Sequence, residues 1–147
     1  MPVTFRYLGD YAINWVKASE PFELNDLFEL ARSRMGPENA HPDLANPLLL
    51  DLRDVELLRS SSDEIRALVR KRASFGAEYS NNPAAFLAKD EGSYGMLRMF
   101  TAYSEVWGLR TDQNTLITLD LTEAASWLIS RSGAPVDELP KLLKLVA

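Results

Sequence analysis

The stretch that decides the fold is residues 48–71, LLLDLRDVELLRSSSDEIRALVRK. It opens with three consecutive leucines, and a short continuous apolar run is typical of an interior strand of a parallel sheet, buried on both faces. Three serines then precede a segment with apolar residues at Ile65, Leu68 and Val69, the spacing of an amphipathic helix. A strand that leads directly into a helix is the repeating unit of α/β domains.

The same alternation of strands and helices continues on both sides of this stretch. Further strands are predicted at 3–8, 11–18, 84–89 and 115–121, with Gly9-Asp10 forming the first turn. Further helices are predicted at 23–35, at 93–107, from Thr122 to Gly133, and within a C-terminal extension at 134–147 that contains Pro140. We therefore predict a single α/β domain over 1–147, with a mixed, mostly parallel sheet of about five strands flanked by helices and 48–54 at its centre. The expected core comprises Ile13, Trp15, Leu27, Leu49, Leu50, Leu52, Ile65, Leu68, Phe86, Met96, Phe100, Ile117 and Trp127.

The composition limits the classes of function. The 147 residues carry 16 Lys and Arg against 21 Asp and Glu, a formal net charge of −5, which argues against nucleic-acid binding. The only tight basic cluster, Arg66 with 70–72, is interpreted as the solvated face of a helix. The absence of cysteine excludes disulfides and thiolate chemistry. No signal peptide and no apolar run long enough for a membrane span are found, so a cytoplasmic protein is expected.

No catalytic signature is found along the chain. The single histidine, His41, lies in a loop without a serine or cysteine pattern beside it, so a catalytic triad is excluded. The segment DEGSYGMLRM, 90–99, lacks the lysine of a phosphate-binding loop and the third glycine of a dinucleotide site. We predict no cofactor, no metal site and no enzymatic activity; carboxylate chemistry at Asp90 and Glu91 is the weakest alternative.

A ligand or partner surface is expected at the carboxyl ends of the strands, where open parallel sheets bind their ligands. Ser93 is expected to cap the helix that follows the strand at 84–89. Methionine and aromatic residues of the 93–107 helix are interpreted as core, with a ligand cavity as the alternative. The residues predicted for the surface are Asp54, Ser60, Ser61, Asp90, Glu91, Ser93 and Tyr94.

The serines after the central strand allow two interpretations. Ser61 followed by Glu64 is the spacing of a capping box, in which each side chain accepts a hydrogen bond from the other residue's backbone N–H. The alternative is a phosphorylation switch at Ser60. Asp63 and Glu64 would repel a phosphate, so the cap is the preferred interpretation.

The segment LLLDLRDVELLRSSS, 48–62, resembles the central motif of the STAS family of anti-sigma-factor antagonists. Arg59 stands where that motif has an aspartate, and Ser62-Asp63 replace its Gly-Leu. The chain is more similar to the related SpoIIAA-like group, through LLLDLRDV, SSDEIRALVRK, SYGMLRMFTAYSE and DLTEAASWL, in that order, over about residues 3–130. The resemblance implies a SpoIIAA-like α/β fold with lipid-binding relatives and no generally assigned activity.

These observations lead to two expectations of function. The first is a non-catalytic regulatory or protein-interaction module of the bacterial type; the alternative is a protein that binds a small apolar or lipid-like ligand. A homodimer is also expected, because an apolar stripe in the extension either packs on its own sheet or meets a second copy. The stripe consists of Val136, Leu139, Leu142, Leu143 and Val146.

Overall fold

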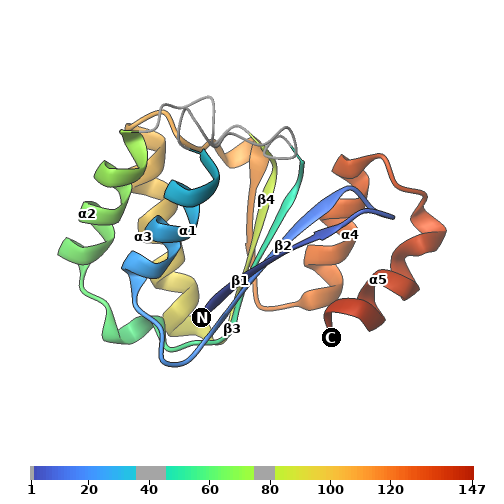
Figure 1. Ribbon diagram of the computed structural model, residues 1–147, viewed down its shortest axis with the longest axis horizontal. Coiled ribbons are helices and arrows are strands. Elements are labelled where there is room, and N and C mark those ends of the chain that lie inside the picture. The colour runs from blue at the N-terminus through green and yellow to red at the C-terminus, as the bar shows by residue number, and fades with distance from the viewer. Residues whose placement is uncertain (1, 36–45, 75–81) are drawn as a thin grey trace.

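The computed structural model describes residues 2–35, 46–74 and 82–147 and contains one mixed sheet (Figure 1). In the described residues its five strands follow one another in chain order across the sheet. The first pair is antiparallel and the other three pairs are parallel. The prediction that 48–54 forms the central strand is therefore confirmed. The strands are β1 (Val3–Leu8), β2 (Ile13–Ser19), β3 (Leu48–Asp54), β4 (Ala84–Ala88) and β5 (Thr115–Thr118).

Helices cover both faces of the sheet, which gives three layers (Figure 1). The helices α1 (Leu24–Met35), α2 (Ser62–Ala73) and α3 (Glu91–Val106) lie on one face. The helices α4 (Leu121–Ser132) and α5 (Leu139–Val146) lie on the other. Short 3₁₀ turns, η2 (Leu57–Arg59), η4 (Asp112–Asn114) and η5 (Val136–Glu138), join some of these elements. The coarse prediction of an α/β domain with helices around a mixed sheet is confirmed.

Two apolar cores result from this layering. Because successive side chains of a strand point to opposite faces, Leu50 and Leu52 of β3 enter the first core, under α1–α3. Leu49, which precedes Leu50, enters the second core, under α4 and α5. Phe86 of β4 belongs to the first core and meets Phe100 of α3 edge to face, with ring centroids 5.9 Å apart.

The expected core is confirmed in part. Ile13, Leu49, Leu50, Leu52, Ile65, Leu68 and Phe86 are buried, whereas Trp15, Leu27, Met96, Phe100, Ile117 and Trp127 are only partly buried and line the edges of the two cores. Trp107, which continues the apolar stripe of α3 in the sequence, is 53% exposed. Trp107 is the C-cap residue of α3, which ends at Val106.

Two helix boundaries differ from the prediction because an aspartate provides the cap. Asp120 caps α4 by accepting from the backbone N–H of Thr122, the residue at which this helix was predicted to begin. Asp90 caps α3 in the same way, by accepting from the backbone N–H of the predicted cap, Ser93. Gly133 ends α4 with φ of 80°, as expected, because glycine adopts this conformation without a steric penalty.

The C-terminal stripe packs mainly within the chain. Leu142 and Val146 are buried in the second core, and Leu139 and Leu143 are packed against it, whereas Val136 is 77% exposed. Pro140 lies in the first turn of α5 and does not interrupt it, because a proline there lacks only an N–H that the helix leaves unused. Most residues of the stripe therefore pack on their own domain and not against a second copy. The homodimer stays a prediction.

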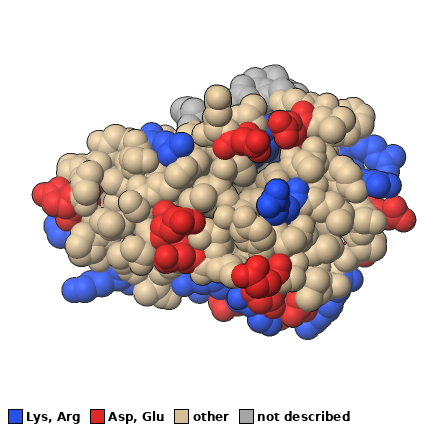
Figure 2. Space-filling model, turned by 180° about the vertical axis from the view of Figure 1, so that it is seen from behind, with Lys and Arg blue, Asp and Glu red and all other residues tan. Residues whose placement is uncertain are grey.

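His41 and residues 36–37, which follow the first predicted helix, lie outside the described residues. No helix in the described part of the chain combines the length and the apolar character that a membrane crossing needs. On the face drawn in Figure 2, acidic and basic side chains of the described residues are interspersed over a largely uncharged surface.

Candidate functional site

The residues predicted for a ligand or partner surface lie at the carboxyl ends of β3 and β4, two neighbouring parallel strands. Asp54 ends β3, is exposed, and forms an ion pair with Lys17 at 3.6 Å. Ser61 is the N-cap of α2: its Oγ accepts from the backbone N–H of Glu64 at 3.1 Å, and the Glu64 carboxylate accepts from the N–H of Ser61 at 3.2 Å. The predicted capping box is therefore confirmed.

The residues of this surface that follow β4 belong to the first turn of α3. The carboxylate of Asp90 accepts from the backbone N–H of Ser93 at 2.8 Å, and this hydrogen bond lowers the pKa of Asp90. Glu91 is exposed, and Tyr94 is half-buried against the first core. Ser60 lines a small cavity of about 30 Å³ under α1–α3, which has room for about one water molecule. The polar groups at this end of the sheet thus serve largely as helix caps.

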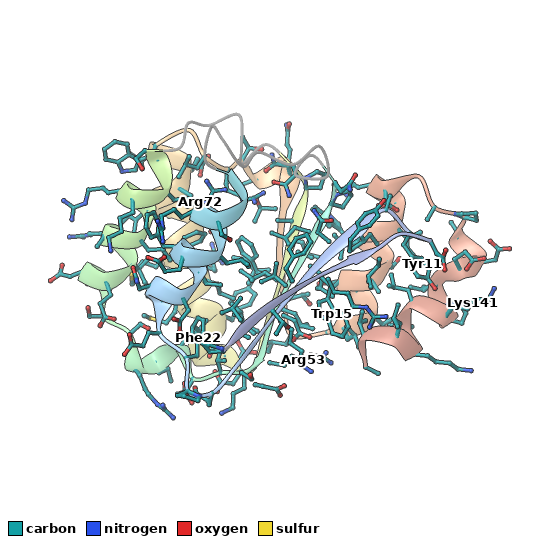
Figure 3. The ribbon with its side chains drawn as sticks, viewed as in Figure 1. Tyr11, Trp15, Phe22, Arg53, Arg72 and Lys141 are labelled. Atoms are coloured by element: carbon teal, nitrogen blue, oxygen red, sulfur yellow. The ribbon has the colours of Figure 1, made fainter. Side chains whose placement is uncertain are left out.

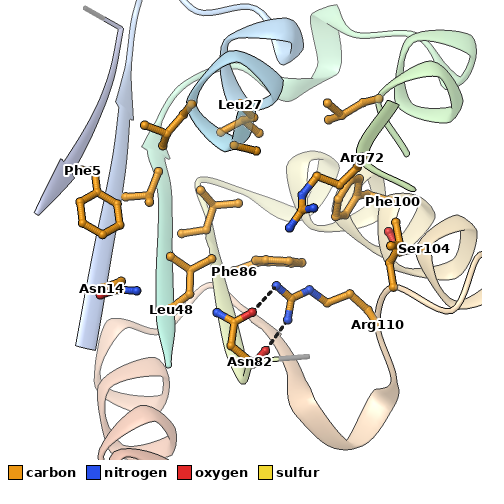
Figure 4. A pocket seen from close by; sticks show the side chains of 16 residues that line it. Phe5, Asn14, Leu27, Leu48, Arg72, Asn82, Phe86, Phe100, Ser104 and Arg110 are labelled. Atoms are coloured by element: carbon orange, nitrogen blue, oxygen red, sulfur yellow. Dashed lines mark hydrogen bonds between the residues drawn. The ribbon is translucent and has the colours of Figure 1, made fainter. Parts of the chain in front are cut away.

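A larger pocket of about 130 Å³ lies at the opposite end of the parallel strands, between the sheet and α1–α3 (Figure 4). Its lining comes from β1–β4, from α1, α2 and α3, and from the segments that precede β4 and follow α3. Most of the lining side chains are apolar: Phe5, Val16, Leu27, Leu30, Ala31, Leu48, Leu50, Leu68, Phe86, Phe100 and Leu109.

A few polar side chains complete the lining of this pocket, namely Asn14, Arg72, Asn82, Ser104 and Arg110. An apolar pocket with a small number of polar groups is the usual form of a small-molecule site. Figure 4 shows the guanidinium groups of Arg72, from the last turn of α2, and of Arg110, from the segment after α3, reaching into it.

Arg110 is held in the pocket wall by neutral groups. It is 8% exposed, and it donates to the carbonyl oxygen of Asn82 at 2.6 Å and to the Asn82 side-chain oxygen at 3.4 Å. Its guanidinium carbon lies 5.7 Å from the centre of the Phe86 ring. Burial, together with the nearby positive charge of Arg72, lowers the pKa of Arg110 to about 10. Arg110 nevertheless remains cationic at neutral pH.

Arg72 corrects the interpretation of the basic cluster as a solvated helix face. Arg66 and Arg70 of that cluster are exposed, but Arg72 is half-buried, and burial lowers its pKa to about 10. The sequence does contain a signal for this placement. Arg72 stands seven residues after Ile65, and positions i, i+3, i+4 and i+7 form the inward stripe of a helix.

The face of the sheet toward α4 and α5 contains a buried carboxylate that the sequence did not single out. Asp51 of β3 is 1% exposed and accepts from Trp15 Nε1 at 3.3 Å and from Arg53 at 2.9 and 2.7 Å. Arg53 also donates to the backbone oxygen of Val146 at 2.6 Å, so the network ties β3 to the end of α5. Figure 3 shows Trp15 and Arg53 on this side of the sheet and Arg72 on the other. The role of this network is therefore structural: it joins β2, β3 and the end of α5.

Within residues 2–35, 46–74 and 82–147, no group of three or more histidine, aspartate or glutamate side chains is placed to hold a metal ion. The larger pocket combines apolar surface with cationic and neutral polar donors, an arrangement suited to binding. Comparison with models of known protein families, with curated proteins and with solved structures gives no match.

Proposed function

We propose that this protein binds a small apolar ligand in the pocket between the sheet and α1–α3. The observation that carries the proposal is the pocket itself: about 130 Å³ lined mainly by aliphatic and aromatic side chains, with polar groups at a few positions. An engineered apolar cavity of about 150 Å³ takes up benzene, so a volume of this size is sufficient for a ring or a short alkyl chain.

The resemblance to the SpoIIAA-like group supports the same proposal, because that group has lipid-binding relatives. We assign the chain to this group on the four motifs quoted above. The role proposed is binding without a chemical reaction.

Native mass spectrometry of freshly purified protein, followed by titration with 1-hexanol monitored through leucine methyl resonances, tests the proposal. We expect a copurifying small molecule or saturable binding of 1-hexanol with shifts at Leu30 and Leu48, which line the pocket. Ala31→Phe should abolish binding because it fills the pocket from α1. Ala102→Phe is the matched control, since Ala102 is exposed on α3. Absence of saturable binding of any small apolar compound by the folded protein would rule the proposal out.

A second candidate function is the regulatory or protein-interaction module expected from the sequence. It is favoured by Leu58 of η2, which is 57% exposed at the carboxyl end of the sheet. Leu58 rests on Gly92 of α3, where an added Cβ would lie 2.6 Å from its Cδ1. Asp54 and Glu91, both exposed, belong to the same end, and interfaces commonly combine an apolar centre with a polar rim.

Affinity capture from the native cell with matched variants tests this second candidate. A partner retained by the wild type and by Val106→Asp, but lost with Leu58→Asp, supports an interface at the carboxyl end. Val106 is a suitable control because it is 83% exposed and is the last residue of α3, at the opposite end of the sheet. Equal capture by all three proteins would assign the interaction to another surface.

A further inference from the structure

We propose that the ligand of the larger pocket is a small amphiphile whose anionic oxygen group, a carboxylate or a phosphate, is bound by Arg110 together with Arg72. The inference rests on the proposed function, because it names the class of ligand that the same pocket would take. It is argued from the charges, the unused donors and the volume of the pocket.

Among the described residues, no negatively charged side chain is paired with Arg110. A buried charge is costly unless it is paired, and buried arginines are normally paired with carboxylates. In the described residues Arg110 contacts the neutral oxygens of Asn82 and the ring of Phe86, and no carboxylate pairs with it. Asn82 takes two of the five N–H donors of the guanidinium. Donors therefore remain for a planar oxygen group, which arginine binds through two parallel hydrogen bonds.

A second cationic side chain, that of Arg72, lines the same pocket. Arg72 and Arg110 come from elements far apart in the sequence, yet both line this pocket, and the charge of Arg72 acts on Arg110. Two like charges in a largely apolar pocket repel each other, and the repulsion is stronger there than in water. An anion held by both guanidinium groups would replace this repulsion with attraction.

The pocket wall also contains a buried hydroxyl group, that of Ser104. Ser104 of α3 is fully buried and lines the pocket, and its Oγ has no hydrogen-bond partner in the described part of the chain. Serine in a helix usually bonds to the preceding turn when it is buried. A hydroxyl that does not do so is able to donate to a ligand oxygen.

The volume limits the apolar part of the ligand. About 130 Å³ is close to the benzene-sized cavity noted above, so the pocket accommodates one ring or one short alkyl chain and not the two chains of a membrane lipid. The ligand class is therefore a short-chain or aryl carboxylic acid, or the corresponding phosphate ester.

Titration of the full chain with hexanoate, hexyl phosphate and 1-hexanol at neutral pH tests the inference, because each has an unbranched skeleton of six carbons and they differ in the head group. We expect hexanoate or hexyl phosphate to bind at least about 10-fold more tightly than 1-hexanol, the effect expected of a charge-assisted hydrogen bond. The more tightly bound of the two anions identifies the head group. Arg110→Gln and Arg72→Gln should each remove most of this preference by weakening the binding of the anions. Arg70 lies on the exposed side of α2, the helix that also carries Arg72, so Arg70→Gln should leave the preference for the anions unchanged.

The outcomes separate this inference from the proposed function. If 1-hexanol binds as tightly as both anions, the anionic head group is refuted and the apolar site stands. If none of the three compounds binds, the proposed function itself fails. If the anion preference survives both Arg110→Gln and Arg72→Gln, the assignment to these arginines is wrong. Should Arg110→Gln fail to fold because Asn82 loses its partner, Arg72→Gln alone decides between these outcomes.

Discussion

Replacing Asp51 with asparagine should destabilise the protein far more than any change at an exposed carboxylate. Asp51 is 1% exposed and its carboxylate accepts hydrogen bonds from Trp15 and from two nitrogens of Arg53. Asparagine has nearly the same shape but has one acceptor oxygen and no charge. The substitution therefore removes the ion pair and leaves the guanidinium of Arg53 without its anion.

The magnitude follows from how deeply each partner is buried. Removing one member of a fully buried ion pair costs about 3–5 kcal/mol. The side chain of Arg53 is 27% exposed and keeps its hydrogen bond to the oxygen of Val146, so water can solvate part of the remaining charge. We therefore expect Asp51→Asn to lower the free energy of unfolding by about 2–3 kcal/mol. At about 2–4 °C per kcal/mol for a domain of this size, Tm should fall by roughly 4–12 °C.

Urea unfolding at neutral pH, followed by tryptophan fluorescence and by circular dichroism, measures this change. The matched control is Asp54→Asn at the end of the same strand, whose ion pair with Lys17 spans 3.6 Å between exposed groups. That control should change the free energy of unfolding by no more than about 0.5 kcal/mol. Equal effects of the two substitutions would refute the reasoning, because they would mean that Asp51 is solvated like a surface carboxylate.

The same network predicts an acid-dependent loss of stability. Burial alone would raise the pKa of Asp51, but the hydrogen bonds and the charge of Arg53 outweigh it, and the pKa is lowered. The folded state therefore favours the ionised carboxylate. Its contribution to stability is fully present above the unfolded pKa of about 3.9 and is lost as the pH falls through the lowered folded pKa. Stability measured between pH 7 and pH 2 should show a smaller acid-dependent loss in Asp51→Asn than in the wild type.

Three further predictions concern the helices and the assembly. Ser61→Ala should cost about 0.5–2 kcal/mol in urea unfolding because it breaks the capping box, whereas Ser60→Ala, outside the box, should cost little; stoichiometric phosphorylation of Ser60 in the native cell would contradict a purely structural role for these serines. Leu142→Ala should cost about 2–5 kcal/mol because Leu142 is 2% exposed in the second core. Leu145→Ala, on the same helix but 37% exposed, should cost about 1 kcal/mol or less. Light scattering at micromolar concentration should give twice the single-chain mass of 16.5 kDa if the expected homodimer forms, and a mass of one chain would count against it.

The local features of the fold could be predicted because neighbouring residues determine them. The three consecutive leucines at the start of β3 identify a strand buried on both faces, and hydrogen bonds within four residues form the capping box of α2. Boundaries at Asp90 and Asp120 were less predictable. Each aspartate competes with nearby serine or threonine for the same backbone N–H groups, and the spacing alone does not decide between them.

The larger pocket could not be predicted in the same way. Its polar residues come from β2, α2, α3 and the segments before β4 and β5, and the spacing along the chain does not indicate that they meet. The burial of Arg72 could have been predicted from its position on the inward stripe of α2. Its positive charge instead favoured the interpretation as a solvated side chain. Arg110 carried none, because its burial results from the packing of a connecting segment against Asn82 and Phe86.

The sequence by itself determined the order of strands and helices, the central place of β3 and the cap at Ser61, because these depend on periodicity and on hydrogen bonds between near neighbours. Only the tertiary structure decided which charges became buried. Asp51 and Arg53 meet Trp15 and Val146 on one face of the sheet, and Arg72 and Arg110 meet in a pocket on the other. The physical reason is that the electrostatic environment of a side chain is set by elements packed around it, which lie as far as 93 residues away along the chain.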